Sequence, residues 1–370
     1  MAEMTLAQLQ AQSLLVLGLC FGVAFVWGVL VHRSHFCTMG AISDVLLMGD
    51  ARRLRQWGLA LALAIFGFGW MSAVGWLQPM NTIYAGQPLN VLTLGLGGTL
   101  FGVGMVLGSG CTSKNLVRLG AGNLKSLVVL LVMGVVALAT MRGWLAVVRV
   151  QVLDGFTITL PAGPFAGQWV QALTAWSLGQ ATLAASALVA VCLLLWVFKE
   201  PSFRRVSQFG PGAATGLVVL VVWWISGVLG FVPEHPETLE PVFLATASGR
   251  MESWSLTAPV AYGLDAFMYF SDGSKRMSLG MALMLGLLAG AWASALQQGT
   301  FRWEGFGQTA DLARHIAGGA LMGLGGVMGL GCSIGQGLSG LSTLSGGSFV
   351  TVLGMALGAV LTLQWQLRRA

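Results

Sequence analysis

The chain has 370 residues, of which 56% are hydrophobic and only 9% are charged, whereas about a quarter of an ordinary soluble domain is charged. Its net charge is +6 and its pI is about 9.4, but the basic residues stand in short clusters between long apolar runs. This composition excludes a soluble enzyme or a nucleic-acid-binding domain and indicates an integral membrane protein that crosses the bilayer many times.

Nine apolar segments without charges are candidates for membrane crossing, which takes roughly 20 apolar residues per helix. They predict an all-α polytopic membrane protein with about nine transmembrane helices and short re-entrant helices or loops. The predicted segments are 11–31, 57–77, 91–110, 126–148, 179–198, 211–232, 278–297, 316–331 and 348–366. The first 30 residues hold no Lys or Arg, which argues against a cleaved signal peptide.

The distribution of Lys and Arg predicts the orientation of these helices. The loop 32–55 carries four arginines and the loop 78–90 carries no charge, so the amino end is expected outside and 32–55 in the cytoplasm. The short loop 199–205 and the carboxyl end fall inside by the same rule. The acidic segment 233–273 falls outside, together with Lys275 and Arg276, which are an exception to the rule. We expect a multi-pass protein of a bacterial inner membrane.

The loop after the first predicted span reads "HRSHFCTMGAISD" and holds Cys37 among histidine and arginine residues. An ordinary cytoplasmic loop with interfacial basic residues explains this pattern. A functional alternative places Cys37 as a thiol at the cytoplasmic mouth of a passage through the membrane.

One glycine-rich pattern occurs twice. Residues 97–111 read "GGTLFGVGMVLGSGC" and residues 318–332 read "GGALMGLGGVMGLGC", with nine of fifteen positions identical. The repeat predicts two homologous halves of one membrane domain, at about 11–148 and 211–366, joined by a connecting helix at 179–198. A single connecting helix turns the second half over, and such inverted repeats build transport sites at the middle of the bilayer.

Each glycine pattern ends in a cysteine, Cys111 or Cys332, followed by a polar, glycine-rich stretch. Irregular backbone at membrane depth is tolerated where it is buried in protein or lines a cavity. We therefore expect two re-entrant loops, with Gly110 and Gly331 in their backbone, that meet in an hourglass whose waist holds both thiols. The glycines alone are also explained by close helix packing, because GxxxG spacing serves that purpose.

The five cysteines do not suggest a disulfide framework, since there is no CxxC and no nearby His with zinc spacing. Cys20 and Cys192 lie in plain apolar helices and are expected to act as small hydrophobic residues. No metal or cofactor is expected. Thiols are soft, weak S–H donors, and they suit a sulfur-bearing anion better than Cu(I), for which paired Met or His residues are missing. Lys114 and Arg118 beside the first loop add positive charge that either attracts the anion or marks the cytoplasmic side.

The motifs "HRSHFCTMGAISD", "GSGCTSKNLVRLGAGN" and "GLGCSIGQGLSGLSTLS" together closely resemble the YeeE/YedE family of bacterial inner-membrane proteins. The resemblance implies an hourglass of inverted repeats and uptake of thiosulfate, relayed by transient S–H···S contacts. It assigns that relay to Cys37, Cys111 and Cys332, and it implies a small cytoplasmic sulfurtransferase-like partner.

Three alternatives remain open at this stage. Selenium compounds are a second substrate class, because other members of the family are described as selenium transporters. The other two alternatives are a membrane thiol-disulfide oxidoreductase and a structural membrane protein.

Overall fold

The computed structural model describes residues 5–273 and 276–368, and most of them are helical. The α-helices in chain order are α1 Leu6–Ser34, α2 Thr38–Met48, α3 Arg52–Ala73, α4 Val91–Leu107, α5 Thr112–Gly120, α6 Leu124–Arg142, α7 Trp144–Val152, α8 Ala166–Leu173, α9 Leu178–Phe198, α10 Val206–Trp224, α11 Thr257–Met268, α12 Leu279–Gln297, α13 Thr309–Met328 and α14 Gly346–Leu367. Short elements complete the list: 3-10 turns η1 Pro79–Asn81, η2 Ile83–Ala85 and η3 Pro201–Arg204, π-turns η4 Ile225–Leu229 and η5 Gly335–Gly340, and strands β1 Phe231–Val232 and β2 Val242–Phe243.

Within the described residues, eight helices are long and apolar enough to cross a membrane, by length and composition. The ninth predicted segment, 316–331, forms most of α13, whose first turns carry Asp311 and Arg314. The prediction of an all-α polytopic membrane protein is therefore confirmed. One predicted segment is divided in the structure, because α6 ends at Arg142 and α7 begins after the extended backbone of Gly143.

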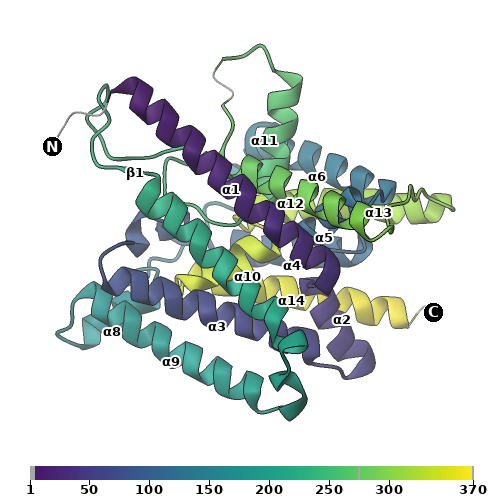
Figure 1. Ribbon diagram of the computed structural model, residues 1–370, viewed down its shortest axis with the longest axis horizontal. Helices are drawn as coiled ribbons and strands as arrows, with labels where there is room; N and C mark the ends of the chain where they lie inside the picture. Colours follow the sequence, from purple (N-terminus) through teal and green to yellow (C-terminus); the bar gives the residue numbers. More distant parts are fainter. Residues whose placement is uncertain (1–4, 274–275, 369–370) are drawn as a thin grey trace.

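The major helix contacts join early parts of the chain to late parts. α1, which crosses the near face of the molecule diagonally, packs along α12, and α10 packs along α3 (Figure 1). In the same way α4 packs along α14, and α13 packs along α6. Helix α9 lies at the lower edge of the view against α3 (Figure 1). The two parts of the chain are thus interleaved.

The two glycine patterns pack against each other, because α4 and α13 run antiparallel with their backbones in contact. A Cβ atom added to Gly104 would lie 2.7 Å from the carbonyl oxygen of Gly318, and one on Gly318 would lie 2.8 Å from that of Gly104. Further along the same pair of helices, a Cβ on Gly325 would lie 2.5 Å from the carbonyl oxygen of Gly97. Any larger side chain would force these helices apart, so close packing explains the repeated glycines.

A second glycine stripe on each of these helices faces a different partner. A Cβ on Gly102 of α4 would lie 2.9 Å from the backbone nitrogen of Ala359 in α14. On α13, a Cβ on Gly323 would lie 3.1 Å from the backbone nitrogen of Ala137 in α6. The glycine-rich helices therefore form the centre of a four-helix layer in the order α14, α4, α13, α6.

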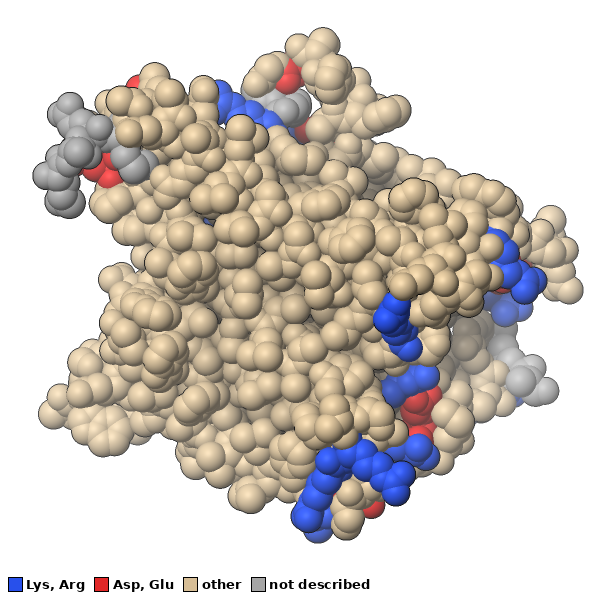
Figure 2. Space-filling view, in the orientation of Figure 1, with Lys and Arg blue, Asp and Glu red and all other residues tan. Residues whose placement is uncertain are grey.

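Basic residues gather where several helix ends meet, and Figure 2 shows them at the lower right of an otherwise mostly uncharged face. Arg33 at the end of α1 donates to Gln297 at the end of α12 over 2.6 Å. Arg55 at the start of α3 donates to the carbonyl of Val197 at the end of α9. Lys125 at the start of α6 forms an ion pair of 2.9 Å with Asp311 at the start of α13, which lowers the pKa of the Asp311 carboxyl.

Candidate functional site

The three loop cysteines each stand directly before a helical segment. Cys37 is the N-cap residue of α2, Cys111 is the N-cap residue of α5, and Cys332 precedes the helical stretch that contains η5. In all three loops the residue two positions before the cysteine is left-handed, with φ of 54°, 55° and 55° at His35, Ser109 and Leu330. The loops before Cys111 and Cys332 also agree at the next residue, since Gly110 and Gly331 have φ of 157° and 154°. The loop of Cys37 has Phe36 at that place and shares only the left-handed residue.

Each sulfur is held by backbone N–H groups of the helical turn that it begins. The N–H of Gly40 donates to Cys37 Sγ, and the N–H of Gly335 donates to Cys332 Sγ, both over 3.4 Å. Cys111 Sγ lies 3.2 Å from Ser113 Oγ and receives the N–H of Lys114. Because the free N–H groups at a helix start carry partial positive charge, the three turns make the surroundings of the sulfurs favourable to an anion.

The structure brings all three cysteines to one buried region, where their exposed fractions are 7%, 0% and 1% in chain order. The side chains of Cys37 and Cys111 interact directly. Cys111 also contacts Ser333, the residue that follows Cys332. Sequence analysis expected Cys111 and Cys332 at one waist and considered Cys37 as a thiol at the cytoplasmic mouth. In the structure Cys37 lies beside Cys111, because the hairpin of α1 and α2 folds its thiol onto the start of α5.

Two buried carboxamides support the loops behind Cys111 and Cys332. Asn115 Nδ2 donates to the carbonyl oxygen of Gly110 over 2.8 Å, and Gln336 Nε2 donates to that of Gly329 over 2.7 Å. Both amides stand four residues after their cysteine, in "CTSKN" and "CSIGQ". This shared spacing is visible in the sequence and could have identified them.

The buried centre also contains polar atoms without a hydrogen-bond partner in the described part of the chain. They are Asn115 Oδ1, Ser333 Oγ and Gln336 Oε1. The hydroxyl of Ser333 lies next to Cys111 and can donate to a bound anion. A buried polar group without a partner is costly, and a ligand that pairs with it recovers part of that cost.

On one side of the cysteines the surroundings are basic. Lys114 is half-buried and acts electrostatically on both Cys37 and Cys111, while His32, His35 and Arg53 lie close to it. We call these four residues the basic side. Arg118 has a structural role, since its guanidinium donates to the carbonyl oxygen of Ser109 over 3.0 Å and so holds the loop before Cys111.

The opposite side is formed by residues that sequence analysis did not select. Tyr84 of η2 is buried and donates its hydroxyl to the carbonyl oxygen of Gly335 over 2.7 Å, beside Cys332. Burial raises the pKa of the Tyr84 phenol, with further contributions from the nearby Cys332 and Glu252. The backbone N–H of Leu256 donates to Cys332. We call Tyr84, Glu252 and Tyr262 the phenolic side.

The segment 233–273, expected to be an external loop of unknown role, supplies part of this phenolic side. It contains β2, the N-cap residue Leu256 and all of α11. No motif in this segment predicts that it lies beside Cys332. The one feature in common with the cysteine loops is that Thr257 begins α11 after Leu256, as Thr38 begins α2 after Cys37.

The remaining cysteines lie within long helices and not in loops before a helix. Cys20 is fully buried within α1 and Cys192 is exposed on α9. Among the residues that the structure describes, no group of three or more His, Cys, Asp or Glu side chains is arranged to hold a metal ion.

The profile of a protein family described as sulphur transport matches residues 33–361. The chain belongs to this sulphur transport family, YeeE/YedE. Two members named "Thiosulfate transporter TsuA" are similar along most of their length. The protein of Spirochaeta thermophila is 29% identical over 362 residues, which cover 94% of this chain and 98% of that protein. The Escherichia coli protein is 27% identical over 331 residues, covering 85% of this chain and 83% of its own.

Membership in the sulphur transport family agrees with the eight helices able to cross a membrane in the described residues. The relatives are named as transporters and not as enzymes, so the oxidoreductase alternative is not supported. This member of the family is a multi-pass transporter, and a bacterial inner membrane fits it.

Proposed function

We propose that this transporter carries thiosulfate or a closely related sulfur anion into the cytoplasm through the buried region of Cys37, Cys111 and Cys332. The observation that carries the proposal is the convergence of three cysteine loops, each with its sulfur at the start of a helical turn. The names of both relatives support thiosulfate as the substrate.

The chemistry of the thiols suits passage of such an anion. A protonated thiol is a weak donor, and the terminal sulfur of thiosulfate is a soft acceptor, so each S–H···S contact is easily made and broken. Conduction needs binding sites that are favourable enough to admit the ion and weak enough to release it. Neighbouring thiols at Cys332, Cys111 and Cys37 provide successive contacts, while backbone N–H groups and Ser333 Oγ offset the charge of the anion.

We assign the basic side to the cytoplasm. The helix ends that carry Arg33, Arg55 and Lys125 lie on that side, which agrees with the positive-inside rule. The anion then meets Cys332 first, Cys111 next and Cys37 last, and leaves past Lys114. This order moves it from uncharged phenols toward positive charge.

The paired element order supports an inverted repeat. In the first half α4, Cys111, α5 and α6 follow one another, and in the second half α13, Cys332, η5 and α14 do so. The packing of α4 on α14 and of α13 on α6 fits a two-fold relation between halves at about 11–148 and 211–366, with α9 as the connecting helix. The two cysteine loops then approach from opposite faces, as the waist of an hourglass requires.

A small sulfurtransferase-like protein is the proposed cytoplasmic partner. A thiolate of that partner would attack the outer sulfur of thiosulfate at the basic side, forming a persulfide as the S–S bond of the anion breaks and sulfite leaves. Consumption of thiosulfate in the cytoplasm maintains the concentration difference that drives uptake.

The proposal is tested with a bacterial host that cannot reduce sulfate and is supplied with thiosulfate as its only sulfur source. We expect growth, and uptake of sulfur-labelled thiosulfate, only when the gene is present. Growth that does not depend on the gene would remove the proposal. Uptake of selenite and sulfite, measured in parallel, decides between sulfur and selenium substrates.

A further inference from the structure

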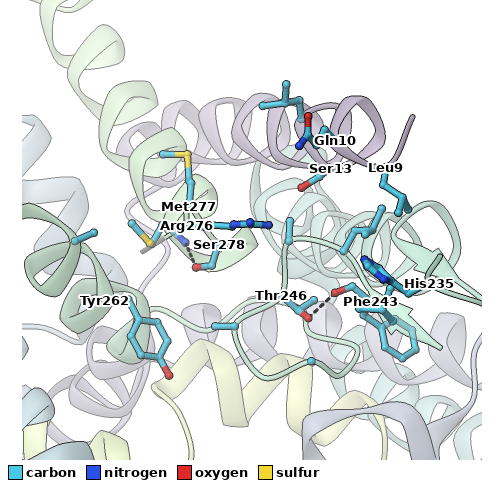
Figure 3. A pocket seen from close by; sticks show the side chains of 18 of the residues that line it. Leu9, Gln10, Ser13, His235, Phe243, Thr246, Tyr262, Arg276, Met277 and Ser278 are labelled. Atoms are coloured by element: carbon cyan, nitrogen blue, oxygen red, sulfur yellow. Dashed lines mark hydrogen bonds between the residues drawn. The ribbon is translucent and has the colours of Figure 1, made fainter. Parts of the chain in front are cut away.

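A cavity of 1110 Å³ opens on the side of the molecule that carries the phenolic residues. Figure 3 shows Arg276, His235 and Tyr262 around it, with Arg276 directed into the space. Under the orientation assigned above, this cavity is external. It also explains the exceptional position of Arg276, because an anion can be attracted there.

One short segment leads from the wall of this cavity to Cys332. Ala247 and Gly249 line the cavity, and Leu256, seven residues further on, donates its N–H to Cys332. Residues 249–256 therefore join the wall of the cavity to the surroundings of the first thiol.

Glu252 stands in the middle of that segment and is partly exposed. Its carboxylate accepts hydrogen bonds from the N–H and the hydroxyl of Ser248, and its own N–H donates to Ser226 Oγ over 3.1 Å. No ion pair of Glu252 with Lys or Arg occurs in the part of the chain that the structure describes. Burial raises the pKa of the Glu252 carboxyl, while the hydrogen bonds from Ser248 lower it to a smaller extent.

The titratable groups that face Glu252 are phenols. Tyr84 of η2 interacts electrostatically with both Glu252 and Cys332, and Tyr262 of α11 interacts with Glu252 and lines the cavity. Burial raises the pKa of both phenols, so both are neutral at any pH near 7. The nearest charged pair, Arg142 with Asp265 at 3.4 Å, acts on Tyr262. Within residues 249–256 Glu252 is the one carboxyl, while the cavity itself is lined by His235 and Glu237.

We propose that Glu252 is a protonatable barrier on the outer approach to Cys332, which an anion passes when the carboxyl is neutral. The proposal rests on the proposed uptake of a sulfur anion. An ionised carboxylate at this partly exposed position repels an anion, because the surrounding protein screens the two charges less than bulk water does. A neutral carboxyl removes the repulsion and can donate its proton to the passing anion as a hydrogen bond.

The test measures the initial rate of labelled thiosulfate uptake into cells or right-side-out vesicles, with the external pH varied between about 5 and 8 and the internal pH held constant. The charge of thiosulfate does not change over this range. For the natural protein we expect the rate to fall as pH rises, approaching about tenfold per unit above the pKa of Glu252, since the neutral fraction falls by that factor. The uptake rate of Glu252→Gln should not depend on external pH. The ratio of its rate to that of the natural protein should therefore be greatest under alkaline conditions.

Two further variants make the test specific. Ser248→Ala removes the hydroxyl hydrogen bond that favours the ionised form and keeps the backbone one, so the fall in rate should move to higher pH. Glu240→Gln removes an exposed carboxyl of the same external segment that does not line the cavity, and it should leave the pH dependence unchanged. Folded protein is measured by size-exclusion chromatography for each variant, and if Glu252→Gln does not fold, the shift with Ser248→Ala decides.

Three results would overturn the inference. They are a natural protein whose rate does not change with external pH, a Glu252→Gln variant with the natural pH dependence, and a Ser248→Ala variant whose midpoint does not move. Absence of thiosulfate uptake at every pH would instead overturn the proposed function, and the inference with it.

Discussion

The basic side and the phenolic side of the buried centre each contain the start of a helix, and they differ in their side chains. On the basic side Cys37 begins α2 next to Cys111, and Lys114 lies within electrostatic reach of both. On the phenolic side Leu256 begins α11 next to Cys332, and Tyr84 and Glu252 replace the cations. The backbone supplies helix starts on both sides, and the side chains decide how each side treats an anion. The predictions below test this division.

The largest effect is expected from loss of a central thiol. Cys111→Ala removes the sulfur that contacts Cys37 and Ser113, and uptake should fall roughly ten- to a hundredfold, as for a lost hydrogen bond to a charged group. Uptake by the Cys332→Ala variant should fall by a similar amount. Labelled uptake is measured against Cys192→Ala, whose side chain is exposed on α9. Equal uptake in all three variants would show that the sulfurs do not contact the substrate.

A smaller effect is expected from loss of the buried cation. Lys114→Gln should weaken the apparent affinity for thiosulfate by about five- to tenfold at low salt, because the charge is only partly screened at its half-buried position. Lys199→Gln is the matched control, since that residue is exposed at the same end of the molecule. If the two variants behave alike, the basic side acts only through the general field of the cytoplasmic surface.

Glycines at equivalent positions of the two patterns, on α4 and on α13, should contribute equally to stability. Gly104→Ala and Gly325→Ala each place a Cβ against the backbone of the other helix and should each cost about 1–3 kcal/mol of stability. Gly18→Ala is the control, because nothing lies within 4 Å of a Cβ at that position. Thermal unfolding in detergent measures the difference. A loss confined to one of the two variants would argue against equivalent halves.

The smallest effect is expected where the two sides differ by one side chain. Leu256→Cys adds a fourth thiol at the start of α11, as Cys37 stands at the start of α2. The backbone N–H that donates to Cys332 is kept. Uptake should stay within about twofold of the natural rate, since that backbone contact is independent of the side chain. A large gain in uptake rate would identify Leu256 as a barrier in the path.

Much of the fold was predictable because membrane helices leave a strong hydropathy signal. The segments 57–77 and 278–297 correspond to α3 and α12 within a few residues. Cys111 and Cys332 were also identifiable, since sulfur at the end of a repeated glycine pattern is unusual. Cys37 was selected from its loop, "HRSHFCTMGAISD". Whether they conduct the substrate is a matter for the experiments above.

The arrangement inside the centre was not predictable, because it depends on contacts between distant segments. Nothing local to Cys37 shows that it meets Cys111, since this contact requires α1 and α2 to fold against α5. The glycine repeat suggested close packing but not that one copy packs against the other. Glu252 and Tyr84 lie in loops whose sequences have no regular pattern.

The backbone contact between α4 and α13 also limits how the protein can work. Gly104 and Gly318 leave no room for one helix to slide or tilt against the other without losing tightly packed atoms. A carrier that rocks its two halves around a central site would have to open this seam in every cycle. We therefore expect a rigid body with small local movements of side chains. The travelling ion, and not the scaffold, then makes the large displacement.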